Sequence, residues 1–381
     1  MKILYITTKA TYGGVQTHIA QCALYMRSKG HTVAVMAHPN DGKGLEKVLH
    51  ESGIPFYPNT SLRNSFNPLS GIIAMWKIRR MSRMFNPDIV STHSTIAGVW
   101  GRFAFFNRVP VIFTAHGWIF TEGVSFLKRF VGICTEKLLA NFSSKIICVS
   151  EHDRLIALKY GISSPSTLVT VHNGVEDFSY LSISKKNRSP KIPVVFVGRL
   201  SSQKDPELLL EALAALPMVT QEKIEVFIIG DGEKRLALEE YILNNQLGSF
   251  VNLLGEKDRV DLLESLGYYA TAESGAIFAL VSHYEGFPRS TLEAMMFGYA
   301  ILTSDVGGAS EAIDDKSGVV ISPNKKDSLV MALEDFIEKR DIRMMGKNAQ
   351  ARVREHFTLE KMLLKTKAIY DEVVLLRANT R

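Results

Sequence analysis

The segment PVVFVGRLSSQKDPELLLEALAAL, residues 193–216, contains the structural unit that recurs along the whole chain. A short run rich in β-branched residues, 193–199, leads into a polar loop, and a segment of helical length follows. Short runs of this kind alternating with helices are typical of βαβ units and parallel sheets. We therefore predict an α/β fold, in which ligands bind beyond the carboxyl ends of the strands.

The alternation forms two series within the 381 residues. Between them, residues 182–193 lose the apolar periodicity and gather Ser, Lys, Asn and Pro, which indicates a linker. A chain of this length also fits two domains better than one core. We expect a first domain over residues 1–185, a second over 186–357 and a C-terminal helix over 358–381. The predicted strands are 2–8, 32–37, 88–92, 111–116, 145–150 and 167–172, then 193–199, 224–230, 250–255, 276–282, 301–305 and 318–322.

The composition indicates a globular protein, with 46% hydrophobic and 22% charged residues. The three cysteines, Cys22, Cys134 and Cys148, form no CxxC pair, so they indicate neither a disulfide framework nor a zinc site. The N-terminal apolar run is too short for a signal peptide, and no stretch approaches the roughly 20 apolar residues of a membrane span. We therefore expect cytoplasmic residence.

Positive charge is concentrated in the first half. Residues 1–180 contain 19 Lys and Arg against 10 Asp and Glu, whereas the remainder contains 26 against 29. In WKIRRMSR (76–83) and GWIFTEGVSFLKRF (117–130), basic residues stand among large apolar ones. This mixture suits the anionic inner face of a cell membrane, although ordinary helices with one solvated face would show it too. No nucleic-acid-binding motif is present, so no nucleic-acid partner is expected.

Two loops carry residues suited to phosphate groups. Gly13 and Gly14 follow the first strand, where glycines let backbone N–H groups approach a phosphate at a helix start. They also suit a tight turn with no ligand. After strand 193–199, Arg199 and Lys204 flank a short loop and could hold a pyrophosphate; the alternative is two surface cations. The segment around Gly13 and Gly14 does not have the GxGxxG sequence, which argues against a nicotinamide enzyme.

Three further strand ends carry candidate residues. Gly230, in IIGDGE, shapes a base or ribose pocket or simply turns the chain. His116 follows the strand 111–116 in FTAHGW, and His93 has a similar position with a weaker claim; a lone histidine is more often packed or solvated than catalytic. The chain shows no catalytic-triad order, HExxH or DxD sequence. No hydrolase triad, metal site or carboxylate clamp for Mg²⁺ is therefore expected.

The segment HYEGFPRSTLEAMMFG, residues 283–298, sets Glu285 eight positions before Glu293. Gly286 and Pro288 are turn residues, so Glu285 is predicted in a loop that feeds a helix. Ser290 and Glu293 have the spacing of a capping box, which places Glu293 in the first turn of that helix. The two acids would then bracket a helix N-terminus, the end that favours anions.

The ensemble resembles the retaining glycosyltransferases of family 4. The segment EGFPRSTLEAMMFG is similar to the family's EX7E motif. The other segments on which the resemblance rests are VGRL followed by QK, the early GG pair, FTAHGW and VHNGVE. The resemblance covers nearly the whole chain. It departs from the family at 274–284, where Ser274 and Gly275 stand at the place of a common Ala-Asp pair. The resemblance implies the GT-B fold: two Rossmann-like domains that face a cleft, with a C-terminal helix that crosses back to the first domain.

The same resemblance implies the site. Arg199 and Lys204 would bind the leaving diphosphate, and Glu293 the ribose hydroxyls. Glu285 and the backbone N–H groups of Gly286 and Phe287 would bind the donor sugar. By the same resemblance, His116 would lie beside the anomeric carbon, Gly14 against the phosphate and Asn173 near the cleft. Gly13 and Gly230 complete the expected donor-binding set, and no metal or other cofactor is expected.

The implied reaction is transfer of a sugar from a nucleotide diphosphate sugar, with a UDP-sugar favoured, to a glycan or lipid-linked acceptor in cell-surface polysaccharide synthesis. The family retains anomeric configuration, most often explained by same-face attack in which the leaving phosphate accepts the acceptor's proton. Two alternatives stay open: a sugar-nucleotide epimerase or hydrolase on the same fold, and an inactive, membrane-docked binding protein.

Overall fold

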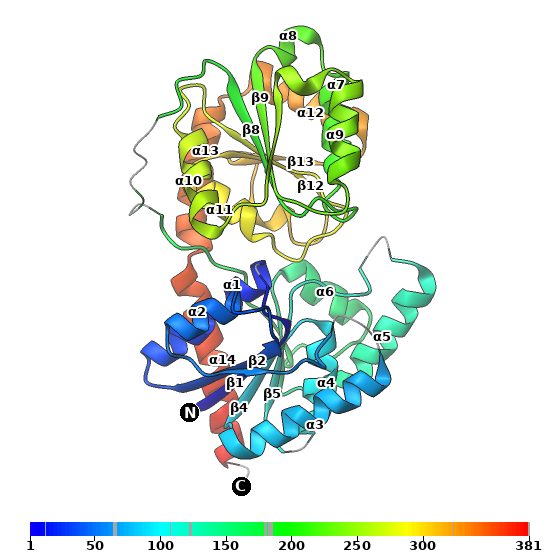
Figure 1. The fold of residues 1–381 in the computed structure, drawn as a ribbon, viewed down its shortest axis with the longest axis vertical. Helices are drawn as coiled ribbons and strands as arrows, with labels where there is room; N and C mark the ends of the chain where they lie inside the picture. Colours follow the sequence, from blue (N-terminus) through cyan, green and yellow to red (C-terminus); the bar gives the residue numbers. More distant parts are fainter. Residues whose placement is uncertain are drawn as a thin grey trace. The chain divides into compact units, whose positions relative to one another are not determined.

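The computed structural model describes residues 1–11, 13–63, 67–106, 108–121, 124–178, 181, 186–322 and 324–379. The chain divides into two compact units (Figure 1). The first unit contains Met1–Asn173 together with Glu360–Arg381, and the second contains Gly174–Leu359. Each unit is built around its own parallel sheet, so the predicted α/β class and the two-domain organisation of the fold are confirmed.

In the described part of the first unit, seven strands form a parallel sheet in the order β3-β2-β1-β4-β5-β6-β7. In Figure 1, helices α1, α2 and α14 lie on one side of this sheet and α3, α4 and α5 on the other. The strands are β1 (Lys2–Lys9), β2 (Thr32–His38), β3 (Phe56–Pro58), β4 (Ile89–His93), β5 (Val111–Ala115), β6 (Lys145–Cys148) and β7 (Leu168–Thr170). The helices are α1 (Gly14–Ser28), α2 (Leu45–Glu51), α3 (Pro68–Phe85), α4 (Thr95–Phe105), α5 (Phe126–Ala140), α6 (Glu151–Lys159) and α14 (Leu359–Asn379).

The second unit has six described strands, also parallel, in the order β10-β9-β8-β11-β12-β13. They are β8 (Ile192–Val197), β9 (Ile224–Ile229), β10 (Val251–Gly255), β11 (Ile277–Leu280), β12 (Ala300–Ser304) and β13 (Gly318–Ile321). The helices are α7 (Pro206–Ala215), α8 (Met218–Gln221), α9 (Arg235–Asn244), α10 (Arg259–Ala270), α11 (Arg289–Phe297), α12 (Lys326–Lys339) and α13 (Ile342–His356), with short 3₁₀ turns at Leu247–Ser249 and Ser310–Ala312.

The twelve predicted strands are all confirmed. Central strands such as β5 (VIFTA) and β11 (IFAL) are buried on both faces and therefore read as largely apolar runs. β4 and β5, for example, are buried at every position. The short strand β3 was not predicted. It lies at the sheet edge, spans three residues and ends at Pro58, so it has neither the length nor the β-branched content of a typical strand.

The C-terminal helix α14 belongs to the first unit, which confirms the predicted crossover. Its Tyr370 hydroxyl donates to Ser91 Oγ in the middle of β4 over 2.7 Å, and its Glu372 pairs with Lys145 at 2.8 Å. Tyr370 is also packed 6.4 Å from the ring of Tyr5 in β1. The last helix therefore completes the face of the sheet on which α1 packs.

The division between the units lies earlier than the composition of residues 182–193 indicates. Val175 N donates to Phe357 O over 3.0 Å, and Leu359 N donates to Val175 O over 2.8 Å. These bonds attach the segment after Asn173 to the second unit, ahead of the expected boundary at 185/186. Linker residues 182–185 lie outside the described residues.

A buried ion pair joins α4 to α5 in the first unit. Arg102 donates from both terminal nitrogens to the Glu136 carboxylate, over 2.8 and 3.1 Å, and from Nε to Gly98 O over 2.9 Å. Its guanidinium carbon lies 4.1 Å from the centre of the Phe113 ring on β5. The two side chains are 0% and 2% exposed. The pair therefore holds both helices against the sheet, and each charge depends on the other for compensation.

Removing only one of these charges should destabilise the protein strongly. Glu136→Gln leaves the Arg102 charge buried without a counter-charge, and we expect a loss of about 3–5 kcal/mol in the free energy of unfolding, measured in urea. The double variant Arg102→Met/Glu136→Leu should recover most of this loss because no charge is left buried.

The exposed pair Lys47–Glu51, with side chains 59% and 61% exposed, provides the control. Glu51→Gln should change stability by less than about 0.5 kcal/mol. A Glu136→Gln protein as stable as the Glu51→Gln control would show that the buried pair contributes nothing to folding.

Candidate active site

The structure brings Glu285 and Lys204 together in the second unit. Glu285 lies in the loop between β11 and α11, with its side chain 8% exposed, and Lys204 lies in the loop between β8 and α7. Lys204 Nζ lies 2.5 Å from Glu285 Oε1, and Ser282 Oγ donates to the same oxygen over 2.6 Å. A nearly buried carboxylate is thus compensated by one cation and one hydroxyl donor. Ser282, two residues after the end of β11, was not predicted, although it stands only three residues before Glu285.

Backbone contacts fix the two loops to each other. His283 N donates to Gln203 O over 2.8 Å, and Gln203 Nε2 donates to Tyr284 O over 3.1 Å. Asp205 caps α7 by accepting from Leu208 N over 3.3 Å, and it also lies 3.0 Å from His283 Nε2. The position of Lys204 is therefore set by the start of α7 and by the neighbouring loop.

A third loop supports the backbone at Glu285 and Gly286. Gly308 N donates to Gly286 O over 2.9 Å. Gly307 has a φ of +56°, and a Cβ there would lie 1.8 Å from Glu285 O, so only glycine fits this approach. Phe287 is buried, with its ring 5.1 Å from that of Phe357. The residues predicted to bind the donor sugar therefore have a rigid support.

Gly230 has a structural reason that is independent of any ligand. Its φ is +146°, and a Cβ would lie 1.9 Å from Gly198 O, at the end of the neighbouring strand. Gly230 thus allows the ends of β8 and β9 to approach closely. Arg199 follows Gly198 directly and is exposed, so this close approach determines where its backbone lies.

Glu293 is placed differently from the prediction. Helix α11 begins at Arg289 with Pro288 as N-cap and without a side-chain cap, and it has no acidic residue in its first turn. Ser290 is already inside the helix, so the predicted capping box is wrong. The cause is Pro288, whose extended backbone starts the helix one residue before Ser290.

Arginines compensate the charge of Glu293. The Glu293 side chain is 5% exposed; its Oε1 lies 2.8 Å from Arg259 Nη1 and 3.8 Å from Arg289 Nη2. Arg259 begins α10, and sequence spacing gave no indication of this pairing. Glu293 is therefore a buried, charged acceptor between two cations and not a helix cap.

In the first unit, the structure brings His116, His93 and Asn173 close to a residue that was not predicted, His18 of α1. His93 Nδ1 lies 3.1 Å from His116 Nε2, and His18 Nδ1 lies 3.2 Å from Asn173 Oδ1. The His18 ring centre is 5.0 Å from that of His116 and 5.5 Å from that of His93. His18 lies four residues after Gly14, and in this segment the sequence indicated a site only at the glycine pair.

His93 connects this cluster to α14. Its Nε2 lies 3.0 Å from Ser91 Oγ, which accepts from the Tyr370 hydroxyl. Burial lowers the pKa of His93 well below 6.5, and the nearby His116 and His18 lower it further. Burial also raises the pKa of Tyr370. Both groups are therefore neutral at pH 7, and a chain of hydrogen bonds runs from the C-terminal helix to His116.

The glycine pair lies at the N-terminus of α1. Gly13 is the N-cap, with a φ of +155° and no side-chain cap, and Gly14 is the first helical residue. Both are exposed. The first N–H groups of α1 are therefore not occupied by a capping side chain, as an anion site requires.

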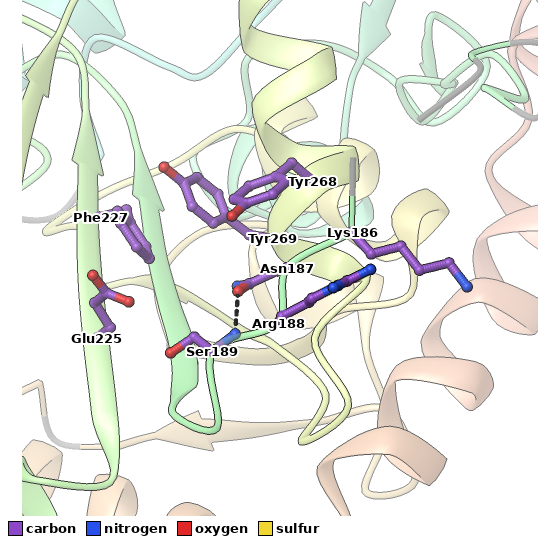
Figure 2. Close-up of a pocket in the computed structure, with 8 residues that line it drawn as sticks. All are labelled: Lys186, Asn187, Arg188, Ser189, Glu225, Phe227, Tyr268 and Tyr269. Carbon is purple, nitrogen blue, oxygen red and sulfur yellow. Dashed lines mark hydrogen bonds between the residues drawn. The ribbon is translucent and has the colours of Figure 1, made fainter. Parts of the chain in front are cut away.

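A surface pocket of about 420 Å³ lies elsewhere on the second unit (Figure 2). Figure 2 shows Tyr268, Tyr269, Phe227 and Glu225 among its lining residues, and the rings of Tyr269 and Phe227 are stacked with their centres 3.9 Å apart. Burial and the charge of Glu225 raise the pKa of Tyr269 to about 12. Glu225 is near the start of β9, whereas Arg199 and Gly230 follow the ends of β8 and β9. The pocket is therefore at the opposite edge of the sheet from the predicted site.

Comparison with known proteins agrees with this architecture. The family "Glycosyltransferase Family 4" matches residues 12–177, and "Glycosyl transferases group 1" matches residues 181–352. A UDP-Gal:alpha-D-GlcNAc-diphosphoundecaprenol alpha-1,3-galactosyltransferase of Escherichia coli is 27% identical over 363 residues, which cover 88% of this chain and 91% of that protein. The O-antigen biosynthesis glycosyltransferase WbnH of Escherichia coli is 26% identical, covering 90% and 94%.

Among solved structures, Anabaena Alr3699/HepE in complex with UDP and glucose is similar, with a TM-score of 0.80 and 21% identity over 98% of this chain and all of that one. The two Rossmann-like sheets thus define a GT-B fold. The chain belongs to glycosyltransferase family 4, and it is a glycosyltransferase.

The close approach at Gly230 gives a direct test of the site's framework. Gly230→Ala should lower the free energy of unfolding by at least about 2 kcal/mol, because the new Cβ meets Gly198 O and the φ is unfavourable. Gly248→Ala is the control, since a Cβ there has no atom within 4 Å. Equal urea midpoints for the two variants would contradict this interpretation of Gly230.

Proposed function

We propose that the protein is a retaining glycosyltransferase that moves a sugar from a UDP-sugar to a lipid-linked or glycan acceptor in cell-surface polysaccharide synthesis. The observation that carries this proposal is the Lys204–Glu285–Ser282 constellation beyond the carboxyl ends of β8 and β11. The Escherichia coli relative named for UDP-Gal and a diphosphoundecaprenol-linked sugar supports the donor and acceptor classes.

The leaving diphosphate is bound by Arg199 and Lys204. Arg199 is exposed and offers a planar fork of donors, and Lys204 is a point charge in a rigid loop. Lys204 already lies against Glu285, so an arriving diphosphate shares a cation whose position is preset. Cations fixed where charge develops usually supply the largest catalytic contribution. The N-terminus of α1 at Gly13 and Gly14 provides a further phosphate contact.

The sugar and ribose are recognised by the two acids. Glu285 accepts hydrogen bonds from the hydroxyls of the transferred sugar, and the N–H groups of Gly286 and Phe287 donate to them. His116 also contacts this sugar. Glu293 accepts from the ribose diol, and Arg259 holds one of its carboxylate oxygens over 2.8 Å. Asn173 holds the ring of His18, which packs against the ring of His116 and so supports the position of His116.

The reaction then needs no protein nucleophile. The acceptor hydroxyl attacks the anomeric carbon on the face from which the diphosphate leaves, and a phosphate oxygen takes the hydroxyl proton. Arg199 and Lys204 supply the positive charge that a metal ion supplies in DxD enzymes, a sequence that this chain lacks. We propose on this basis that transfer is independent of metal.

Donor binding is tested by thermal shift with a panel of nucleotide sugars. The true donor at 100 times its Kd should add about 2.7 kcal/mol to the stability of the wild type. Glu285→Gln and Glu293→Gln should lose most of this gain, because an amide is a poorer double acceptor for hydroxyls. Glu273→Gln, at an exposed glutamate near the opposite edge of the sheet, should keep it.

The outcomes separate transfer from the alternatives. UDP release that requires acceptor, with a product of unchanged anomeric configuration by NMR, supports a retaining transferase. Release at the same rate without acceptor would indicate a hydrolase. A donor gain that survives both Glu285→Gln and Glu293→Gln would remove these acids from the site.

We also propose that the first unit docks on an anionic membrane through the exposed faces of α3 and α5. Helix α4 packs between these two helices, on the same side of the sheet (Figure 1). Trp76 and Met84 on α3 are 67% and 76% exposed, and Phe126 and Leu127 on α5 are 84% and 70% exposed. The remaining exposed apolar residues of this surface are Leu69, Ile72, Ile73, Phe130, Val131 and Leu138.

The charge of this α3/α5 surface fits an anionic membrane. The exposed basic residues there are Lys77, Arg80, Arg83, Lys128 and Lys137. Helix α3 contains no acidic residue, and the single acid of α5, Glu136, is buried against Arg102. Apolar side chains together with cations are the combination that inserts at a headgroup boundary. No helix in the described ranges has the length and hydropathy to cross a membrane.

Liposome sedimentation tests this docking. Wild type should bind vesicles rich in anionic lipid at low salt, and Arg80→Glu/Arg83→Glu should weaken binding at least about tenfold, since each basic residue near the surface contributes about 1 kcal/mol. Arg343→Glu/Lys347→Glu on α13 makes the same change in net charge on the second unit and should leave binding unchanged. Equal effects of the two double variants would indicate attraction by net charge alone and overturn the docking surface.

A further inference from the structure

Three histidines of the first unit are arranged like a set of metal ligands. His18 comes from α1, His93 from the end of β4 and His116 from the residue after β5. One ring nitrogen of each lies within 4.8 Å of the others. A tetrahedral zinc ion with Zn–N bonds of about 2.0–2.1 Å needs its nitrogens roughly 3.3 Å apart. His93 Nδ1 and His116 Nε2, at 3.1 Å, already have nearly this spacing, so only a small movement of His18 is needed.

The outer contacts of two rings favour metal-binding tautomers. Asn173 Oδ1 lies 3.2 Å from His18 Nδ1; when it accepts a hydrogen bond from Nδ1–H, the His18 lone pair is on Nε2. Ser91 Oγ lies 3.0 Å from His93 Nε2, and its second lone pair can accept from that nitrogen while the first accepts from Tyr370; His93 then has its own lone pair on Nδ1. Metal-binding histidines characteristically use the second ring nitrogen in this way.

We propose that His18, His93 and His116 bind one Zn²⁺ ion, and that this ion inhibits sugar transfer. Three imidazoles without a carboxylate suit Zn²⁺ and not Mg²⁺ or Ca²⁺, which prefer oxygen. His18 and His93 are 2% and 1% exposed, whereas His116 is only partly buried, so the ion enters from the side of His116. Water completes the tetrahedron.

Inhibition follows because the ion uses the nitrogen of His116 that now faces His93. On binding, the metal takes the place of the proton on His116 Nε2, and this proton moves to His116 Nδ1, so the ring stays neutral with one proton. The His116 ring is then fixed to the ion and cannot contact the donor sugar. This second part of the inference rests on the proposed function of His116, whereas the binding of zinc does not.

Equilibrium dialysis of metal-stripped protein against Zn²⁺ tests the site without donor or acceptor. Wild type should bind one equivalent, and His18→Gln and His93→Gln should each weaken binding at least 100-fold. His356→Gln, at a histidine of α13 with 46% of its side chain exposed, is the control and should bind as the wild type does.

A second variant keeps all three ligands. Asn173→Asp offers His18 a carboxylate acceptor, and we expect Zn²⁺ affinity to rise about tenfold, because outer partners change metal affinity by roughly 10–100-fold. Melting curves of each variant confirm that it is folded. Absence of zinc binding by wild type, or equal binding by folded His93→Gln, would overturn the site.

Transfer assays then separate the two proposals. One equivalent of Zn²⁺ should abolish transfer by wild type, and a chelator should restore it. Zinc binding by a protein that never transfers sugar would reject the proposed function and keep the metal site. Transfer that continues at full rate with zinc bound to the three histidines would reject inhibition.

Discussion

The parallel direction of every described strand is the constraint on which the rest of this structure depends. It places all carboxyl ends of a sheet at one edge, so residues distant in sequence meet there without any local signal. Lys204 and Glu285 are 81 positions apart, and they pair because β8 and β11 are neighbours. His93 and His116 meet for the same reason at the ends of β4 and β5. The fold thus assembles each set of polar residues before any ligand is present.

The charges assembled in this way are compensated in advance. Glu285 and Glu293 are nearly buried carboxylates, and each has a cation within 2.8 Å. A buried carboxylate without a partner would be costly, so these pairs lower the cost of burying both acids. Lys204 and Arg259 are more exposed than the acids that they face, at 18% and 35%. The cations therefore keep a side toward solvent, where an anionic ligand can reach them while the acids stay paired.

Sequence patterns predicted the sheets well and the site only in part. Buried parallel strands read as apolar runs, so twelve strands and the crossover of α14 followed from periodicity and resemblance. The polar residues at strand ends, such as Lys204, Glu285 and His116, followed from the same logic. What failed depends on context: a local rule assigned Ser290 as a cap because it does not include the extended backbone of Pro288. Arg259 and His18 were missed because their partners, Glu293 and Asn173, are distant in sequence and carry no spacing rule.

The C-terminal helix shows how far this dependence extends. Residues 1–173 contain every strand of the first sheet, yet the hydroxyl that fixes Ser91, and through it His93 and His116, comes from Tyr370. Tyr370 is almost fully buried, so its contact with Ser91 is made inside the core and is not a surface attachment. A hydroxyl buried there has to find an acceptor, and Ser91 supplies it. The half of the protein that carries the histidine cluster is therefore complete only when the last segment of the chain has returned to it, which makes the geometry of His116 a property of both ends of the sequence.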